Sequence, residues 1–471
     1  MNSFLKKFFM LMVLFSLLFI VACSNTTQET QQETDNEPES SEDEDSQEPE
    51  EDTAEFENME LDVAAFEGGY GSAFWDALKS KFEEAYPGVT VNLESNPNIG
   101  DMIRPQIVGG NAPDVIYLNQ TDQSGVTQGL IKDQALVDIT DIFESESIDG
   151  DGLIKDKILP GALESIFMSP YGDGKVYLAP YNYTIMGLWY NNTLFEEEGI
   201  EAPTTWDEFY ALQDKAEELD RSLFTYQGTN PGYLEEILIP AVYNLGGQEA
   251  LDQMLIDYDP EFWNSETALE ALGIFEKIAN EGMLMDGTVA LNHTQSQTEF
   301  MQGNSMFVPN GNWFEGEMAE APREDGFIFG FAGVPTFDSS EDSMALASFE
   351  QVYIPKSSDN IELAKEFLKF MYTEEAVKLN GEHAEGVMAV QGAADLVQDH
   401  ITESSYESFK AVEEGMYAVS GNFGPVPEGV NIEPRSILFD QVADVMNGDM
   451  SAEEWAAIMY DAYEEVQSKM E

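Results

Sequence analysis

Two sequence patterns alternate along residues 61–118, and this alternation limits the possible folds more than any other feature of the chain. Three short apolar runs predict strands, and two longer segments with apolar residues at helical spacing predict helices between them. The strands are predicted at residues 61–66, 89–93 and 114–118, and the helices at residues 72–86 and 99–108. Because such alternation builds parallel βαβ units, the sequence predicts an α/β lobe.

The carboxyl ends of these predicted strands indicate where a ligand would bind. In open α/β sheets, ligands lie beyond the carboxyl ends of the strands. The segments that end two of the predicted strands contain Glu67 and Tyr70, and Tyr117 and Asn119. We therefore expect these four side chains near a binding site.

The charge balance is strongly acidic and excludes several classes of partner. The chain has 91 acidic residues against 20 lysines and arginines, which gives a formal net charge of −71. Nucleic acid and anionic lipid surfaces would repel such a chain. Acid-rich, lysine-poor surfaces suit high salt, so we hypothesise a halophilic source. An ordinary acidic bacterial surface protein is the alternative.

Residues 1–22 have the pattern of a secretion signal. Two lysines precede an apolar run at residues 8–21, which is too short to span a bilayer comfortably. Ala22 then precedes the only cysteine, Cys23, so no disulfide can form within the chain. This segment resembles the lipobox of bacterial lipoproteins, which implies cleavage before Cys23 and a lipid on its sulfur. An uncleaved anchor with an unmodified cysteine is the alternative.

Residues 23–58 are predicted to be the lipidated Cys23 followed by a disordered acidic tether. Residues 24–57 contain 15 acidic residues, no lysine or arginine, and almost nothing apolar. We expect this tether to hold the folded part at the extracellular face of the cell membrane. Its length favours a Gram-positive-like surface over a periplasm. No later run of 18 apolar residues predicts a transmembrane helix.

Several short motifs follow one another along the chain. They are YPGV at 86–89, GGNAPDV at 109–115, YNNTLF at 190–195, PTTWDEF at 203–209, FMQGNSM at 300–306, NGNW at 310–313 and AKEFLKFM at 364–371. Each motif is weak alone. Their order and spacing over roughly residues 60–375 resemble the family of ABC-transporter extracellular solute-binding proteins that includes maltose-binding protein.

This resemblance implies an α/β fold of two lobes, the periplasmic-binding-protein type II fold, which closes like a clamp about crossing hinge segments. A chain of 471 residues is also long enough for two cores. The crossing segments are expected near residues 185–190 and 348–353. The amino-terminal lobe is expected at residues 59–184 and 350–399, and the carboxy-terminal lobe at residues 185–349 and 400–471.

The resemblance also implies a function. A protein of this kind captures a sugar between its lobes and delivers it to the permease subunits of an ABC importer, as a monomer and without a cofactor. The stretch FEGGYG at 66–71, with NIG at 98–100 and PQIVGGN at 105–111, looks most like the members that bind N-acetylglucosamine and chitobiose.

Aromatic residues beside turns are the best candidates for contacts with a sugar. Aromatic faces accept the C–H faces of sugars, and amide and carboxylate side chains bind hydroxyls. Trp313 follows Asn-Gly-Asn at the position where sugar-binding relatives place a stacking tryptophan, and Tyr233 occupies a second-lobe loop that often supplies an aromatic. The other candidates are Glu67, Tyr70, Tyr117, Asn119, Tyr181, Asn182, Asn312 and Glu350. Packing in a core is the alternative for each aromatic.

The sequence contains no catalytic signature, so we predict a binding protein and not an enzyme. Nucleophile-elbow, zinc-protease and phosphate-loop motifs are missing from it. Residues 149–152 begin like a calcium loop but lack its later ligands, so we predict a turn and no metal site. The alternatives are a binding protein for a cationic solute such as a polyamine or betaine, a secreted glycosidase with two carboxylates at fixed separation, or an adhesin.

The acidic composition predicts that salt stabilises the folded part. Raising NaCl from low to molar concentration should raise the midpoint of thermal unfolding of residues 58–471, because counterions screen the repulsion between carboxylates. Circular dichroism during heating measures this midpoint. A midpoint that stays constant or falls with NaCl would contradict the halophilic interpretation.

Overall fold

The computed structural model describes residues 56–470, except 121, 123, 339–342, 425, 427–428 and 431. Contacts divide the chain into Met1–Thr53 and Ala54–Glu471, and the elements below all belong to the second unit. The predicted signal peptide, Cys23 and nearly all of the predicted tether lie outside the described residues. None of the helices in the described ranges has the length and apolar character needed to cross a bilayer.

The amino-terminal segment folds as the alternating pattern predicts. Its elements are β1 (Glu60–Phe66), α1 (Ala73–Ala85), β2 (Thr90–Asn96), α2 (Ile99–Val108) and β3 (Val115–Tyr117). Strand β1 pairs in parallel with β2 on one side and with β3 on the other. The predicted βαβαβ arrangement is therefore confirmed, with boundaries that differ by at most three residues.

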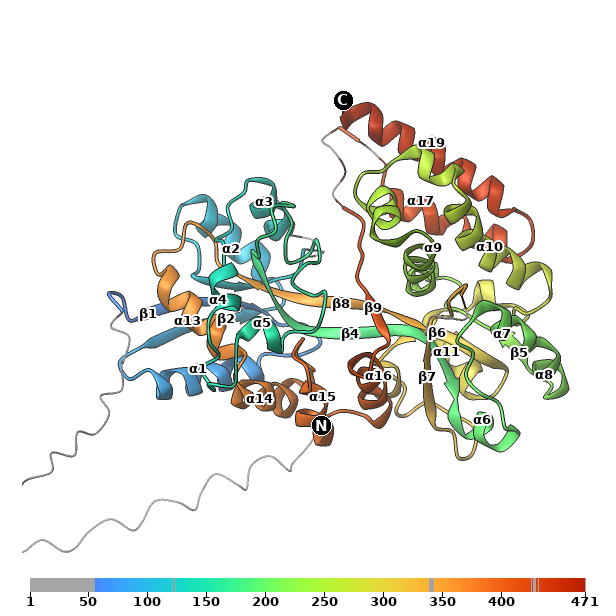
Figure 1. Ribbon diagram of the computed structural model, residues 1–471, viewed down its shortest axis with the longest axis horizontal. Helices are drawn as coiled ribbons and strands as arrows, with labels where there is room; N and C mark the ends of the chain where they lie inside the picture. Colours follow the sequence, from blue (N-terminus) through green and yellow to red (C-terminus); the bar gives the residue numbers. More distant parts are fainter. Residues whose placement is uncertain are drawn as a thin grey trace, which may run out of the picture. The chain divides into compact units, whose positions relative to one another are not determined.

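Two long strands connect the two halves of this unit. Strands β4 (Leu178–Asn191) and β8 (Met344–Tyr353) pair antiparallel, from Leu178 opposite Tyr353 to Met186 opposite Leu346. Figure 1 shows them side by side between the region of β1 and β2 and the region of β5 to β7. They correspond to the crossing segments predicted near residues 185–190 and 348–353.

One sheet runs through both halves. Its strand order is β2-β1-β3-β8-β4-β6-β5, with β7 added beside β4 and β9 beside β8. The remaining strands are β5 (Ser222–Phe224), β6 (Ser305–Gly311), β7 (Phe329–Gly333) and β9 (Tyr417–Val419).

Helices cover the sheet in both halves (Figure 1). In the first half they are α3 (Val126–Lys132), α4 (Thr140–Glu144), α5 (Ile154–Lys157), α13 (Ile361–Met371), α14 (Glu374–Ala384) and α15 (Ala393–Val397), with the 3₁₀ turn η4 (Gln398–His400). In the second they are α6 (Asn192–Glu198), α7 (Trp206–Ala211), α8 (Gln213–Glu218), α9 (Glu235–Leu255), α10 (Glu266–Asn280), α11 (His293–Met301) and α12 (Phe314–Glu317), with η1 (Pro231–Leu234), η2 (Pro260–Asn264) and η3 (Thr288–Ala290).

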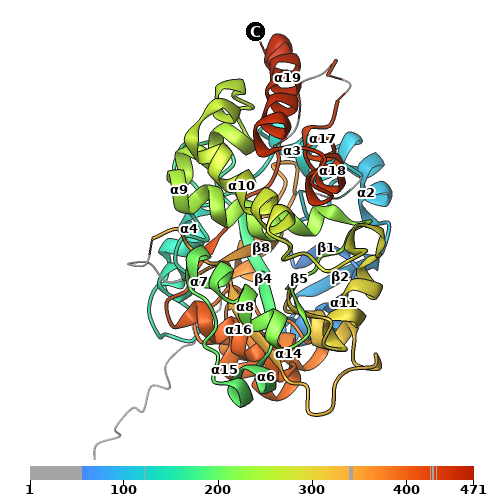
Figure 2. The same cartoon turned by 90° about the vertical axis from the view of Figure 1, so that its right-hand side faces the viewer.

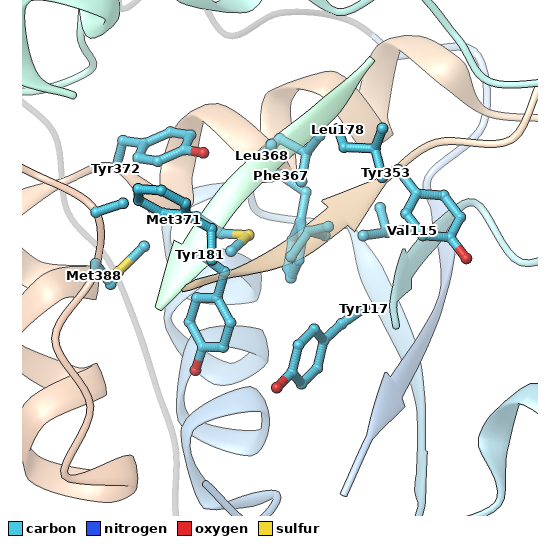
Figure 3. Close-up of a cluster of buried hydrophobic side chains, with 14 of the residues drawn as sticks. Val115, Tyr117, Leu178, Tyr181, Tyr353, Phe367, Leu368, Met371, Tyr372 and Met388 are labelled. Atoms are coloured by element: carbon cyan, nitrogen blue, oxygen red, sulfur yellow. The ribbon is translucent and has the colours of Figure 1, made fainter. Parts of the chain in front are cut away.

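Two main hydrophobic cores define the two lobes, and the crossing strands contribute to both. Along β8, Ala345 and Ala347 belong to the first core, whereas Met344 and Leu346 belong to the second. Figure 3 shows part of the first core, where Val115 of β3 and Tyr353 of β8 lie with Phe367 of α13. Because side chains alternate along a strand, one strand can serve two cores at once.

The carboxy-terminal helices divide between these cores. Helices α17 (Pro434–Asp440), α18 (Val442–Met446) and α19 (Ala452–Met470) lie together in Figure 2 and supply Leu438, Val445 and Trp455, among others, to the second core. Helix α16 (Glu403–Glu413) instead places Phe409 in the first core, with its ring centroid 4.7 Å from that of Tyr183. The lobe boundaries given above stay a prediction.

A capping box begins α7, in the motif that carries part of the family resemblance. The Thr205 hydroxyl accepts a hydrogen bond from the Glu208 amide at 3.2 Å, and the Glu208 carboxylate accepts one from the Thr205 amide at 3.1 Å. Two amides that the helix itself cannot satisfy thereby gain partners.

Replacing Thr205 by alanine should lower the free energy of unfolding by about 1 kcal/mol, because this N-cap bond is lost. Thr294→Ala is the matched control, since that threonine is exposed within α11 and alanine favours a helix. Urea titration followed by circular dichroism measures both variants. Equal stability of the two variants would contradict the role given to the capping box.

Candidate ligand-binding site

A cavity of about 540 Å³ lies where the crossing strands meet the second lobe. Met186 of β4 and Leu346 to Ser348 of β8 form one wall. The other walls come from η1, the start of α9, and α17, together with Trp313 at the start of α12. Segments that are far apart in the sequence therefore meet around one space of the size that small-molecule sites usually have.

Trp313 and Tyr233, the two leading candidates from the sequence, both line this cavity. Trp313 is half-buried, and its ring packs so closely over Gly311 that a Cβ there would lie 2.1 Å from it. Glycine at 311 therefore allows the ring to take this position. Burial and the nearby carboxylates of Glu236 and Glu317 raise the pKa of Tyr233 to about 12, opposed by a hydrogen bond with Trp313.

Asn312, another predicted site residue, bonds to the crossing strand β4 and is not among the residues that line the cavity. Its side-chain oxygen accepts a hydrogen bond from the backbone amide of Ile185 at 3.0 Å, and its backbone amide donates to the Ile185 carbonyl at 2.9 Å. These bonds tie the residue before Trp313 to the crossing strand β4. The position of the tryptophan ring therefore depends on β4.

An ion pair supports the opposite wall of the cavity. Arg435 of α17 donates to Glu235 of α9, with Nη2 to Oε2 at 2.6 Å and Nε to Oε2 at 3.0 Å. A Cβ on Gly232 would lie 2.9 Å from this guanidinium, so glycine leaves room for it. Burial raises the pKa of the Glu235 carboxyl, although the guanidinium acts in the opposite direction.

Glu236 is the unusual acid of the cavity. The residue is only 5% exposed, and its Oε2 atom has no hydrogen-bond partner within the part of the chain that the structure describes. Burial, with the neighbouring Glu235 charge, raises the pKa of its carboxyl well above the ordinary value.

A second group of predicted residues comes together in the first lobe. The Tyr117 hydroxyl donates to the Glu350 carboxylate at 2.9 Å, and the ring centroids of Tyr117 and Tyr181 are 5.2 Å apart. Tyr70 lies beside Tyr181, with ring centroids 6.4 Å apart. Figure 3 shows the rings of Tyr117 and Tyr181 on the same side of the cluster, with their hydroxyls directed away from Leu368. Burial, opposed by bonds from Tyr117 and Asn119, raises the pKa of Glu350.

Strand β8 links the two groups. Ser348 lines the cavity, and Glu350 follows two residues later. Side chains two residues apart in a strand point to the same face and lie roughly 7 Å apart. Glu350 with its neighbours Tyr70, Tyr117 and Tyr181, here called the Glu350 group, thus lies two residues along β8 from the cavity. A ligand longer than one ring could reach it.

The other predicted residues have different surroundings. Tyr181 donates from its hydroxyl to Asn380 at 2.7 Å, and Asn380 donates to buried Asn182 at 2.7 Å, which forms a network inside the first lobe. Asn119 accepts from the Gln351 amide at 3.2 Å. Glu67 is exposed after β1.

Residues 149–152 form the turn that the sequence predicts. The ammonium of Lys157 lies 3.3 Å from Asp149 and 3.0 Å from Asp151, so one lysine partly compensates the charge of these two carboxylates. Among the described residues, no group of three or more histidine, cysteine, aspartate or glutamate side chains is arranged to hold a metal ion.

Sequence reasoning missed Glu236 and Arg435. Glu236 carries a weak signal, because it immediately precedes the apolar run Ile237 to Ala241 on α9 and shares the burial of that run. Arg435 carries none, since 200 residues separate it from its partner Glu235.

A sequence model of the bacterial extracellular solute-binding protein matches residues 67–378. The chain belongs to this family. The family predicted from the short motifs is therefore confirmed.

Relatives of this solute-binding protein carry names that refer to sugars. The diacetylchitobiose binding protein NgcE of Streptomyces coelicolor is 28% identical over 76% of this chain and 74% of its own length. The multiple sugar-binding protein of Streptococcus mutans is 23% identical over 67% of this chain and 71% of its own.

Solved structures confirm the predicted fold. Ligand-free RafE of Streptococcus pneumoniae aligns over 86% of this chain and 99% of its own, with a TM-score of 0.67 and 16% identity. A complex of RafE with raffinose aligns over 86% of this chain and 100% of its own, with a TM-score of 0.58 and 17% identity. This solute-binding protein has the two-lobed type II fold.

The raised pKa of Glu236 predicts a pH-dependent effect of Glu236→Gln on stability. Below pH 4.5, the ordinary glutamate value, both folded and unfolded chains keep the proton, so the variant should differ little from the wild type. Above it, the unfolded chain loses the proton while the folded chain retains it, so the wild type loses stability relative to the variant until the folded pKa is passed. Urea unfolding of both proteins at a series of pH values measures the difference.

Glu249→Gln is the matched control on the same helix. Its side chain is exposed to water, so the substitution should change stability little at any pH. An advantage of Glu236→Gln that shrinks as the pH rises would contradict the assignment.

Proposed function

We propose that this protein is an extracellular, lipid-anchored sugar-binding protein that delivers its ligand to an ABC importer. The observation that carries the proposal is the cavity where Trp313 and Tyr233 meet polar side chains beside the crossing strands. A sugar ring has apolar C–H faces and a rim of hydroxyls, and this combination of aromatic and polar groups suits both.

The position of the cavity supports binding between two lobes. Its walls include both crossing strands, and the Glu350 group of the first lobe lies one step further along β8. A ligand in contact with both would stabilise a closed arrangement and shift the population toward it. The names of the relatives, which refer to diacetylchitobiose, to multiple sugars and to raffinose, support a saccharide of one to a few rings.

Release completes the proposed cycle. The closed, loaded protein docks on permease subunits, which open the lobes and take the sugar. Dissociation constants near 1 μM, about −8 kcal/mol, would suit capture followed by release. We further propose that Cys23 carries the lipid that holds the protein at the outer face of the membrane, that the protein acts as a monomer, and that it has no enzymatic activity.

Trp313→Ala should weaken sugar binding about 30-fold, a loss of ~2 kcal/mol, because an aromatic wall of the cavity is removed. Trp313→Phe should restore part of the affinity, since it keeps an aromatic face. Tyr460→Ala is the control, because Tyr460 lies on α19 and does not line the cavity.

The ligand itself is found by a thermal-shift screen with N-acetylglucosamine, chitobiose, malto- and xylo-oligosaccharides, spermidine and glycine betaine, followed by titration calorimetry. A bound ligand raises the unfolding midpoint by mass action. A shift with spermidine or betaine alone would replace the sugar by a cationic solute. Unchanged sugar affinity in Trp313→Ala would place the sugar elsewhere.

A further inference from the structure

Glu236 differs from the other acids of the cavity because it is buried and one of its carboxyl oxygens lacks a hydrogen-bond partner among the described residues. Glu235 is paired with Arg435, and Asp440 is exposed to water. Glu236 is 95% buried, lines the cavity, and has an oxygen without a hydrogen-bond partner among the residues described. A buried ionised carboxylate is costly unless a donor or a counter-charge compensates it. The described residues supply neither at this oxygen, so in the ligand-free protein the raised pKa keeps the carboxyl protonated. A cationic ligand would supply the counter-charge that the ionised form needs.

The charges around Glu236 favour a cation. The acidic and basic side chains of the cavity are three carboxyl groups, those of Glu235, Glu236 and Asp440, and one guanidinium, that of Arg435. Tyr233 is the other titratable group there, and the crossing strands contribute only uncharged residues to the wall. Arg435 already donates to Glu235 through Nε and Nη2, and it makes no hydrogen bond to the Oε2 atom of Glu236.

Sugar hydroxyls and sugar amines differ in how well they would compensate the Glu236 carboxyl. A hydroxyl can donate a hydrogen bond to Glu236 but brings no charge. A protonated amine brings a donor and a positive charge together, and charge-assisted hydrogen bonds are roughly twice as strong as neutral ones. Carboxylated or sulfated sugars would add a further negative charge beside three carboxyl groups.

We propose that the preferred saccharide carries a protonated primary amine on the ring that stacks on Trp313, and that Glu236 recognises this ammonium group. This inference rests on the proposed sugar-binding function and names the substrate class within it. Glu236 is then the specificity-determining residue of the cavity, and Trp313 supplies binding energy that does not depend on the substituent.

The experiment compares three β-1,4-linked disaccharides that differ mainly at carbon 2 of each ring. They are the glucosamine disaccharide with free amines, its N,N′-diacetylated form, and cellobiose with hydroxyls. Titration calorimetry with the full chain in detergent, at pH 6 where the sugar amines are protonated, measures each affinity. The free-amine sugar should bind at least about tenfold more tightly than the other two.

Two variants assign the preference to Glu236. Glu236→Gln keeps the shape but not the charge, and should weaken binding of the free-amine sugar at least about tenfold while changing cellobiose by less than about threefold. Asp444→Asn removes a like charge from an exposed position on the neighbouring helix α18, outside the cavity, and should keep the preference for the amine. If both variants lost the preference for the amine equally, that preference would come from the overall negative charge of the protein, and the role of Glu236 would be overturned.

The wild-type comparison stands even if a variant fails to fold. Equal or tighter binding of the acetylated sugar or of cellobiose would overturn the amine proposal and leave the sugar-binding function intact. Binding of another sugar from the screen, with none of the three disaccharides bound, would have the same meaning. Binding of spermidine alone would overturn both proposals.

Discussion

The two lobes and the candidate site all depend on the antiparallel pairing of β4 with β8. Alternate residues of β8 enter the first and the second core, so neither core can be rearranged without moving the strand that the other also uses. Packed cores tolerate little change of this kind. Ser348 in the cavity and Glu350 in the tyrosine group are therefore held at a set spacing by the same strand. A hinge in this region would have to act through twisting of paired strands.

Bonds to β4 and an ion pair between two helices hold the walls of the cavity in place. Asn312 bonds to Ile185 of β4 through its side chain and its backbone, and this places Trp313. The facing wall is held by the pair of Glu235 and Arg435, which joins α9 to α17. Aromatic and polar groups are thus positioned before a ligand arrives, which lowers the entropic cost of binding.

The acidity of the chain has two different physical meanings. Most carboxylates lie at the surface, where water and counterions compensate them, and they affect solubility and the response to salt. Glu236 is buried and lacks a partner at one oxygen among the described residues. Composition alone does not distinguish these cases, because a count of acids says nothing about which of them water reaches.

Local elements and family membership were accessible from the sequence. The opening strands and helices follow from apolar periods that adjacent residues define, and the Thr205 capping box follows from residue types three positions apart. The order of short motifs indicated the family and the two crossing strands. The aromatic candidates Trp313 and Tyr233 were also visible, because each stands beside turn residues.

Only the tertiary structure showed which partners the polar candidates have. Asn182 and Asn312 look like groups for binding hydroxyls, but they bond to Asn380 and to the backbone of Ile185. Glu236 looks like one acid among 91, but folding buries it in the wall of a cavity. Hydrogen-bond partners and burial depend on segments up to 200 residues apart, such as Glu235 and Arg435. The sequence by itself determined the local elements and the family, because both depend on short-range patterns, whereas the chemistry of the cavity was decided by long-range packing.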